Sequence, residues 1–419
     1  MKYGLIGEHL GHSFSSEIHA LCAPYEYELL ELSPDEVGAF MKRAEFSAIN
    51  VTIPYKKTVI PYLDEVDELA KKIGSVNTVV NRGGKLCGYN TDLFGMLALL
   101  RHAGIDIKNK KVLILGTGGT SHTARALCEH CGAREYITVS RKSSEIAVSY
   151  EEAYRDHSDA EVIINTTPCG MFPYADGNEE RAAEPIDISA FSNLCGVVDA
   201  VYNPLRTNLV QKARERGIPA SGGLYMLVAQ GVFASRLFLG DVGEPDDEFL
   251  ESIYKKIKAQ KENTVLIGMP GSGKSTVGVA LARELGRVFV DTDELVEKKE
   301  GKSIPEIFAE PGEEGFRRIE SEAVAEVSSL SGAIIAPGGG AVLKGENVFR
   351  LKRNGKLFFL DRPLESLIPT EDRPLAKSAD AIKKLYSERY GIYEAAADQR
   401  IGGERTVEET LKLIKDEIL

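Results

Sequence analysis

The sequence predicts an α/β protein in which parallel strands alternate with helices. Short apolar runs alternate with helical stretches along the whole chain, a pattern typical of βαβ units. Two glycine-rich segments, near residues 116 and 268, each stand between an apolar run and a helical stretch. Loops in that position bind phosphate groups in this fold class. The length of 419 residues corresponds to about three domains.

Composition and charge restrict the partners and the compartment. The chain is 43% hydrophobic and 27% charged, which is ordinary for a globular protein. Its net charge of −12 argues against nucleic acid or an anionic membrane as the main partner, because clustered cations bind both. No apolar run approaches the roughly 18 residues of a membrane span, and the first residues lead into a strand rather than a signal peptide. With six scattered cysteines, we expect reduced thiols and a cytoplasmic protein.

In the first block, polar residues gather where apolar strands end. The strand expected at residues 2–7 leads to Ser13 and Ser15, whose hydroxyls either cap the next helix or hold a small polar ligand. Pro54 stops the next strand, and residues 73–78 and 88–92 are interpreted as two further strand ends. Open α/β sheets bind ligands at such ends. The polar residues expected there are Asn50, Thr52, Lys56, Asn77, Asn90 and Asp92.

The first glycine-rich segment indicates a dinucleotide loop. Gly116-Thr-Gly118-Gly119 follows an apolar strand and precedes a helix, although it lacks the full G-x-G-x-x-G spacing. The next strand ends in Ser140-Arg141-Lys142, where an NAD site needs an acidic residue for the ribose 2′-hydroxyl. Basic side chains there would favour the 2′-phosphate of NADP, since charge-assisted hydrogen bonds contribute ~1.5–3 kcal/mol each. The alternative is a solvated basic turn.

Further along, strands are expected at residues 161–165 and 196–199, the second leading to Tyr202. A last helix starts at Gly223 and carries Gln230 on an otherwise apolar turn. Cys128-Glu-His-Cys131 has the spacing of a metal or redox pair. No second ligand pair follows at zinc spacing, which favours a packing role late in a helix.

Residues 1–255 resemble shikimate dehydrogenase from end to end. The resemblance rests on Ser13-Phe-Ser15, Asn50 to Lys56, Val76-Asn77-Thr78, Asn90-Thr-Asp92, Gly116 to Gly119, Ser140-Arg141 and Gly223 to Gln230. It implies NADPH-dependent reduction of 3-dehydroshikimate to shikimate, with Lys56 and Asp92 as the catalytic pair. It also implies a shikimate pocket lined by Ser13, Ser15, Asn50, Thr52, Asn77, Asp92 and Gln230, with Tyr202 nearby. The cofactor-binding residues would be Gly116, Gly118, Gly119, Ser140, Arg141, Lys142 and Gly223.

The chemistry of a carbonyl reduction suits the Lys56–Asp92 pair. Hydride arriving at a carbonyl carbon creates an alkoxide, which needs a proton or a nearby cation. Lys56 can supply either, and Asp92 would hold it charged and positioned. The sequence leaves open which of the two residues moves the proton.

The second glycine-rich segment, Gly268 to Ser275, matches G-x-x-x-x-G-K-[ST] in full. It lies between an expected strand at 264–267 and a helix, where backbone N–H groups and the helix N-terminus hold phosphate oxygens. Lys274 would reach the β- and γ-phosphates, and Ser275 would bind Mg²⁺. A glycine-rich turn with a chance lysine is the alternative. The nucleoside-triphosphate site would comprise Gly271, Ser272, Gly273, Lys274, Ser275 and Thr276.

Two carboxylates and a second exposed turn follow in this half. Asp291-Thr-Asp293 ends the strand expected at 287–290, and carboxylates beside a P-loop suit Mg²⁺ and a substrate hydroxyl. The strand at 333–336 ends in Pro337 and the Gly338-Gly339-Gly340 turn. No N-K-x-D motif for guanine recognition occurs, which argues against a GTPase.

Residues 263–419 resemble shikimate kinase. The matching motifs are Lys274-Ser275, Asp291-Thr-Asp293, Phe316-Arg317, Glu320, Gly338-Gly339-Gly340, Arg373-Pro-Leu and Arg389 before Tyr393. The resemblance implies that Asp293 binds or deprotonates the shikimate 3-hydroxyl and that Asp291 supports Mg²⁺. It places the three glycines in the substrate pocket.

The resemblance to shikimate kinase also implies roles for three arginines. Arg317 and Arg389 would clamp the shikimate carboxylate, for which the guanidinium fork is well shaped. Arg373 would lie on a mobile lid and stabilise the phosphoryl group during its transfer. The segment 362–373 departs from the family pattern, because it is short, contains two prolines and lacks an arginine to pack on adenine.

Together these features predict a two-domain shikimate dehydrogenase with a Rossmann-type NADP domain, followed by a P-loop α/β kinase domain with a parallel sheet. The expected parts are a substrate-binding domain at 1–100, a Rossmann domain at 101–222, helices and linker at 223–262, and the kinase at 263–419. The implied ligands are NADPH/NADP⁺, ATP, Mg²⁺ and the two small-molecule substrates.

The preferred hypothesis is a bifunctional enzyme running consecutive steps. One alternative makes the kinase part a non-catalytic nucleotide sensor. Another is an NAD-using, quinate-type dehydrogenase, against which Ser13, Ser15 and Arg141 argue. The oligomeric state and direct passage of shikimate between sites stay open.

Overall fold

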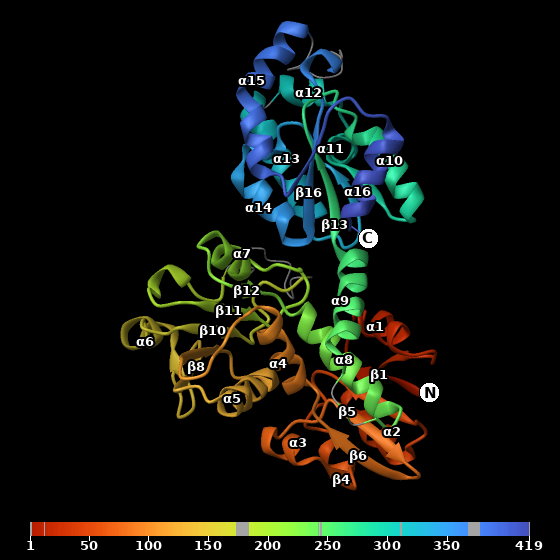
Figure 1. Cartoon of the computed structure of the whole chain (residues 1–419), viewed down its shortest axis with the longest axis vertical. Helices are drawn as coiled ribbons and strands as arrows, with labels where there is room; N and C mark the ends of the chain where they lie inside the picture. The colour runs from red at the N-terminus through yellow and green to blue at the C-terminus, as the bar shows by residue number, and fades with distance from the viewer. Residues whose placement is uncertain are drawn as a thin grey trace. The chain divides into compact units, whose positions relative to one another are not determined.

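In a computed structural model of the chain, the structure describes residues 2–11, 13–172, 184–241, 243, 245–310, 312–367 and 378–418. The chain divides into two compact units, Met1–Ile257 and Lys258–Leu419 (Figure 1). Within the described ranges, no helix combines the length and the apolar character that a membrane crossing requires. The finer division of the first unit stays a prediction.

The first sheet of unit 1 has the order β2-β1-β3-β5-β6-β4. Its strands are β1 Tyr3–Gly7, β2 Glu28–Glu31, β3 Ala48–Val51, β4 Glu65–Val66, β5 Thr78–Arg82 and β6 Lys85–Tyr89. The expectation of parallel pairing throughout is wrong here, because β5 runs antiparallel to both β3 and β6. Gly83 and Gly84, with φ of +65° and +96°, form the two-residue turn that joins β5 and β6 in a hairpin and accounts for their antiparallel pairing.

The interpretation of residues 73–78 as a strand end is also wrong, because residues 73–77 precede β5 and Thr78 begins it. Thr78 pairs with Asn50, so the start of β5 lies beside the end of β3. The polar residues of the first block therefore still meet at one edge of the sheet.

The second sheet of unit 1 is parallel throughout, in the order β12-β11-β10-β7-β8-β9. Its strands are β7 Lys111–Leu115, β8 Glu135–Ser140, β9 Val148–Ser149, β10 Val162–Asn165, β11 Gly196–Asp199 and β12 Ala220–Ser221. Every residue of β7 is buried. The strand order reverses at β7, which is the position where open α/β sheets bind ligands.

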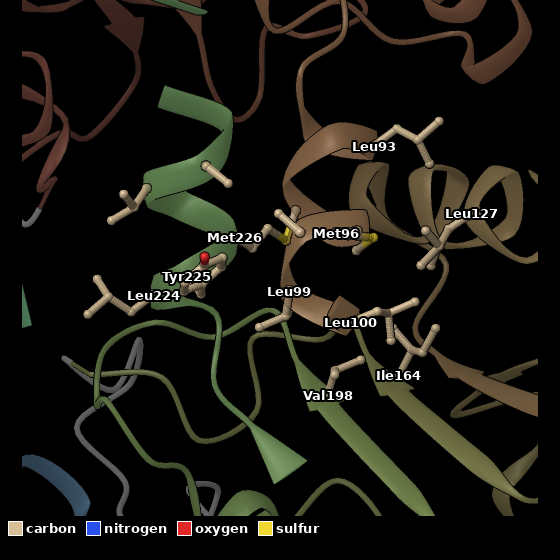
Figure 2. Close-up of a cluster of buried hydrophobic side chains, with 14 of the residues drawn as sticks. Leu93, Met96, Leu99, Leu100, Leu127, Ile164, Val198, Leu224, Tyr225 and Met226 are labelled. Carbon is tan, nitrogen blue, oxygen red and sulfur yellow. The ribbon is translucent and has the colours of Figure 1, made fainter. Parts of the chain in front are cut away.

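Two helices of unit 1 pack closely against each other: α4, Asp92–His102, and α8, Leu224–Phe238. Figure 2 shows Met226 of α8 facing α4, within a buried core that includes Met96 and Leu99. A Cβ at Gly95 would lie 2.7 Å from the backbone oxygen of Met226, so glycine permits this approach. The other helices are α1 Ser15–Cys22, α2 Pro34–Arg43, α3 Glu68–Ile73, α5 Gly119–Cys131, α6 Tyr150–Asp156, α7 Asn208–Glu215 and α9 Asp247–Lys261.

Helix α5 ends at Cys131, and Gly132 follows in the left-handed conformation. Cys128 is completely buried in the core, and this burial raises the pKa of its thiol to about 12. Its surroundings are those of a packing residue.

Unit 2 is a parallel sheet in the order β14-β15-β13-β16-β17. Its strands are β13 Asn263–Ile267, β14 Phe289–Asp291, β15 Ile334–Ala336, β16 Gly355–Asp361 and β17 Gln399–Gly402. The helices are α10 Lys274–Leu285, α11 Thr292–Glu300, α12 Ile304–Ala309, α13 Gly312–Ser328, α14 Gly345–Asn354, α15 Ala379–Ala396 and α16 Val407–Ile418 (Figure 1). The central β13 leads directly into the P-loop, so the predicted strand–loop–helix setting is confirmed.

Candidate active sites

The Lys56–Asp92 pair is assembled in unit 1. Lys56 Nζ lies 2.6 Å from Asp92 Oδ2, and the two side chains are 20% and 9% exposed. Asp92 is the first residue of α4, where the helix dipole favours a carboxylate. Its other oxygen, Oδ1, accepts a hydrogen bond of 2.9 Å from Asn77 Nδ2. The pair is thus a close, largely buried ion pair held from both sides of the carboxylate.

Asn77 connects this pair to helix α8. Its Nδ2 is 2.9 Å from Thr91 Oγ1 and 3.5 Å from Gln230 Oε1. Its Oδ1 accepts the backbone N–H of Thr91 at 2.8 Å. Gln230 is held in turn by the backbone oxygen of Leu227, at 2.9 Å. Predicted residues from three separate elements therefore share one hydrogen-bonded cluster.

Asn50 and Thr52 lie at the end of β3. Asn50 Nδ2 donates to Thr78 Oγ1 at 3.1 Å, and its Oδ1 accepts a 2.7 Å hydrogen bond from the Tyr27 hydroxyl. Tyr27 was missed at the sequence level, because nothing in its local pattern links it to residue 50. His19 stacks on the Tyr27 ring at 3.9 Å, and burial lowers the pKa of His19 to about 3. A neutral imidazole therefore supports the ring that orients Asn50.

Ser13 and Ser15 lie side by side, with 3.0 Å between their hydroxyl oxygens. Neither serine is the N-cap residue of α1: that residue is Phe14, which makes no side-chain capping bond. The Phe14 ring instead packs edge-on against Tyr202, with 5.2 Å between ring centroids. Ser13 Oγ accepts the backbone N–H of Ser15, the first residue of α1, at 3.2 Å. Tyr202 is brought to the same end of the unit.

The dinucleotide loop follows β7 as predicted. Gly116 has φ of +103°, and a Cβ there would lie 3.0 Å from Thr166 Oγ1. Gly118 is the N-cap residue of α5 and Gly119 its first residue, so the loop leads directly into a helix N-terminus, where phosphate groups bind in this fold class.

The other predicted cofactor residues lie at two strand ends. Ser140 ends β8, and the Arg141 and Lys142 side chains after it are exposed. Gly223, the N-cap residue of α8, donates its N–H to the backbone oxygen of Val201 at 2.8 Å. A Cβ on Gly223 would overlap the backbone oxygen of Ala200, so only glycine fits there.

The P-loop of unit 2 is curled by three glycines, Gly268, Gly271 and Gly273, with φ of +153°, +83° and +87°. Lys274 begins α10, and its Nζ donates to the backbone oxygens of Gly268 at 2.9 Å and Met269 at 3.3 Å. The preceding Ser272 is buried and the following Thr276 is exposed. The loop has the backbone form that a phosphate chain requires.

The two residues predicted to hold Mg²⁺ are together. Ser275 Oγ donates to Asp291 Oδ2 at 2.7 Å. Asp291 caps α11, and its Oδ1 accepts the backbone N–H of Asp293 at 2.9 Å. A hydroxyl and a carboxylate beside a P-loop are the oxygen donors that Mg²⁺ prefers, so these residues fit the metal.

Asp293, Arg317 and the glycine turn form a second cluster in unit 2. Gly338 donates its N–H to Thr292 Oγ1 at 2.9 Å, and a Cβ on Gly338 would overlap Asp293 Oδ1. A Cβ on Gly340 would overlap the guanidinium of Arg317. The turn therefore lies directly against the predicted acid and the predicted clamp.

Arg389 reaches the same turn from α15. Its Nη1 donates to the backbone oxygen of Gly339 at 3.3 Å, and the Tyr393 hydroxyl donates to the same oxygen. Arg317 Nη1 donates to Glu320 Oε2 at 2.7 Å. In the sequence analysis, Glu320 belongs to a motif shared with shikimate kinase, but no role was assigned to it. Burial raises its pKa to about 7, even though Arg317 acts in the opposite direction.

Arg373 lies outside the described residues, so its place on a lid stays a prediction. At the start of the segment 362–373, Arg362 Nη1 donates to the backbone oxygen of Arg405 at 2.6 Å.

Comparison with known proteins covers both units. Residues 5–79 match the family model of the shikimate dehydrogenase substrate binding domain, and residues 270–418 match that of shikimate kinase. A shikimate dehydrogenase (NADP(+)) from Halothermothrix orenii is 37% identical over 265 residues, which cover 57% of this chain and 90% of the relative. One from Clostridium perfringens is 35% identical over 276 residues, covering 62% and 98%.

Solved structures agree with this assignment. Shikimate dehydrogenase 1 from Peptoclostridium difficile is 32% identical, with a TM-score of 0.54 over 61% of this chain and 97% of its own. A chorismate mutase/shikimate 5-dehydrogenase fusion from Clostridium acetobutylicum is also 32% identical, with a TM-score of 0.55 over 61% and 96%. The chain therefore belongs to the shikimate dehydrogenase family, and a shikimate kinase domain follows at its C-terminal end.

Proposed function

We propose that this chain is a bifunctional enzyme of the shikimate pathway. Its first unit reduces 3-dehydroshikimate to shikimate with NADPH, and its second unit phosphorylates shikimate to shikimate 3-phosphate with ATP. The observation that carries the proposal is that one chain holds two assembled sites. Lys56 Nζ lies 2.6 Å from Asp92 Oδ2 in one, and Ser275 Oγ lies 2.7 Å from Asp291 Oδ2 in the other.

In the first step, bound NADPH supplies a hydride to the carbonyl carbon. Negative charge then develops on the carbonyl oxygen, and the Lys56 ammonium stabilises it and is a donor of the proton it needs. Asp92 holds Lys56 charged and in place. Lys56 Nζ and Asp92 Oδ2 are 2.6 Å apart, so both residues lie where the proton transfer would take place.

The substrate ring is held by groups around this pair. Ser13 and Ser15 present two hydroxyls 3.0 Å apart, a spacing suited to a carboxylate. The amides of Asn50, Asn77 and Gln230 bind ring hydroxyls and fix the carbonyl near Lys56. Thr52 and Tyr202 complete the pocket. Gly116, Gly118, Gly119, Gly223 and the Ser140–Lys142 turn bind the cofactor.

In the second step, ATP with Mg²⁺ supplies the phosphoryl group. Asp293 accepts the proton of the 3-hydroxyl as that oxygen attacks. Lys274 exchanges its backbone acceptors for phosphate oxygens, and Ser275 and Asp291 hold the metal. Arg317 and Arg389, which already contact the Gly338–Gly340 turn, bind the carboxylate of shikimate. Arg373 steadies the phosphoryl group in transfer.

A coupled assay on the full chain tests this function. With 3-dehydroshikimate, NADPH, ATP and Mg²⁺, NADPH oxidation should be followed by ADP release. Lys56→Ala should abolish NADPH oxidation while shikimate added directly is still phosphorylated. Lys274→Ala should do the reverse. Failure of the wild-type chain to consume ATP with shikimate would reject the kinase step and favour a nucleotide-sensing module.

A further inference from the structure

Three basic side chains converge on the first half of helix α5, outside the residues assigned above. His122 lies in the first turn of α5, and Arg125 follows three residues later on the same helix face. Lys57, from the turn after β3, reaches across from the first sheet of unit 1. Its Nζ lies 3.4 Å from His122 Nε2. Lys57, His122 and Arg125 are called the basic triad below.

The basic triad has no acidic partner. Among the described residues, none of the three side chains forms an ion pair with a carboxylate. Arg125 Nε donates to Thr138 Oγ1 at 3.1 Å, but its Nη2 is buried and has no hydrogen-bond partner. The second half of α5 differs, because Glu129 there pairs with Lys72 at 2.8 Å. Among the described residues, the lack of a carboxylate partner is thus found at the end of α5 that follows the glycine loop.

An unpaired group of bases is unfavourable until an anion arrives. Burial lowers the pKa of His122, and the nearby charges of Lys57 and Arg125 lower it further. A buried guanidinium nitrogen without an acceptor also costs free energy. A phosphate oxygen would satisfy the free donor and remove the repulsion between like charges. The helix N-terminus adds positive potential at the same place.

A dinucleotide bound at the glycine loop would bring its phosphate groups to this end of α5. We propose that Lys57, His122 and Arg125 bind a phosphate group of the nicotinamide cofactor, as a clamp that reaches over from the catalytic segment. This inference rests on the proposed dehydrogenase function. Because Lys57 adjoins Lys56, anchoring the cofactor at Lys57 also positions the catalytic lysine. The phosphate is either the diphosphate bridge or the 2′-phosphate.

Titration of the full chain with NADPH and with NADH, followed by nicotinamide fluorescence, tests the clamp. The variants are Lys57→Gln, His122→Gln and Arg125→Gln. Each should weaken NADPH binding by about tenfold, the size of one charge-assisted hydrogen bond. Equal weakening for NADH assigns the contact to the diphosphate bridge. Weakening for NADPH alone assigns it to the 2′-phosphate.

Two controls separate the possible failures. Lys72→Gln removes the base that pairs with the other half of α5, and it should leave both affinities unchanged. Shikimate phosphorylation by the same preparations reports on the integrity of the chain. Unchanged cofactor affinity in all three variants overturns the clamp, as does an equal loss in Lys72→Gln. If the wild-type chain binds neither dinucleotide, the proposed dehydrogenase function itself fails.

Discussion

Asp199 is a fully buried carboxylate, with no exposed surface, that connects two loops at the second sheet of unit 1. It accepts hydrogen bonds from Asn165 Nδ2 at 2.9 Å, from the Val201 N–H at 3.0 Å and from Thr207 Oγ1 at 2.7 Å. Burial raises its pKa to about 6, and the three donors oppose that shift. Asp199 thus fixes the segment that leads to Tyr202.

Replacing Asp199 with alanine should destabilise unit 1. Three buried donors would lose their acceptor, which we expect to lower the free energy of unfolding by about 3 kcal/mol. Urea denaturation of the full chain measures this. Asp187→Ala is the matched control, because Asp187 is exposed and accepts mainly from the Ser189 N–H. Equal stability of the two variants would contradict the assigned role of Asp199.

Glu320 should make the kinase step sensitive to pH. Its pKa is about 7, so it is ionised above that pH and holds Arg317 through a hydrogen bond of 2.7 Å. Below that pH the carboxyl becomes protonated, and Arg317 loses a charged partner. We therefore expect kcat/KM for shikimate to fall as the pH drops through about 7. Glu320→Gln should lose this dependence, and persistence of the same profile in that variant would exclude Glu320 as its source.

At the scale of secondary-structure elements, the contact between α4 and α8 positions the dehydrogenase site. Helix α4 carries Asp92 at its start, and helix α8 carries Gln230. Gly95 lets the two helices approach, since a Cβ there would also lie 3.1 Å from Gln230 Cβ. Their separation therefore sets how Gln230 faces the Lys56–Asp92 pair.

Gly95→Ala should push these helices apart. We expect an overpacking cost of about 1–3 kcal/mol in stability and a larger KM for shikimate in the dehydrogenase step. Gly391→Ala in α15 is the matched helical control, because a Cβ there meets nothing within 4 Å. That substitution should be neutral or stabilising by up to ~1 kcal/mol. A Gly95 variant with normal KM and stability would show that the helix contact is not limiting.

Many of the strands were predictable from the sequence. Strands β10, β11 and β13 lie within one residue of their expected bounds, because each is a buried apolar run with a continuous signal. The direction of β5 was not predictable from residues 73–78. Pairing direction depends on which strand lies beside β5, and the Gly83-Gly84 turn alone could not identify that neighbour.

At the scale of the whole molecule, the chain consists of two units with separate cores. Each core is built from its own sheet and helices. Each also binds its own nucleotide in the proposed function. Two units of this kind are expected to unfold as separate cooperative transitions.

Ligands should therefore raise the two transitions independently. In calorimetry of the full chain, saturating NADP⁺ should raise one Tm and Mg²⁺ with ATP the other, since a ligand at 100 times its Kd stabilises by about 2.7 kcal/mol. The Lys274→Ala variant should lose only the response to ATP. A single transition shifted by both ligands would contradict the independence of the units.

The sequence by itself determined both phosphate-binding loops and the family of each unit. These features are contiguous, because a strand, a glycine turn and a helix start are encoded within a dozen or so neighbouring residues. It also placed the polar residues near strand ends.

Only the tertiary structure decided which of those residues meet. Lys56 and Asp92 are 36 residues apart, and Asn77 and Gln230 are 153 apart. Their contact requires a particular strand order, the reversal at β5 and the close packing of α4 on α8. Tyr27 behind Asn50 and the basic triad on α5 arise in the same way. The physical reason is that long-range contacts are selected by the packing of whole elements, which no short run of residues specifies.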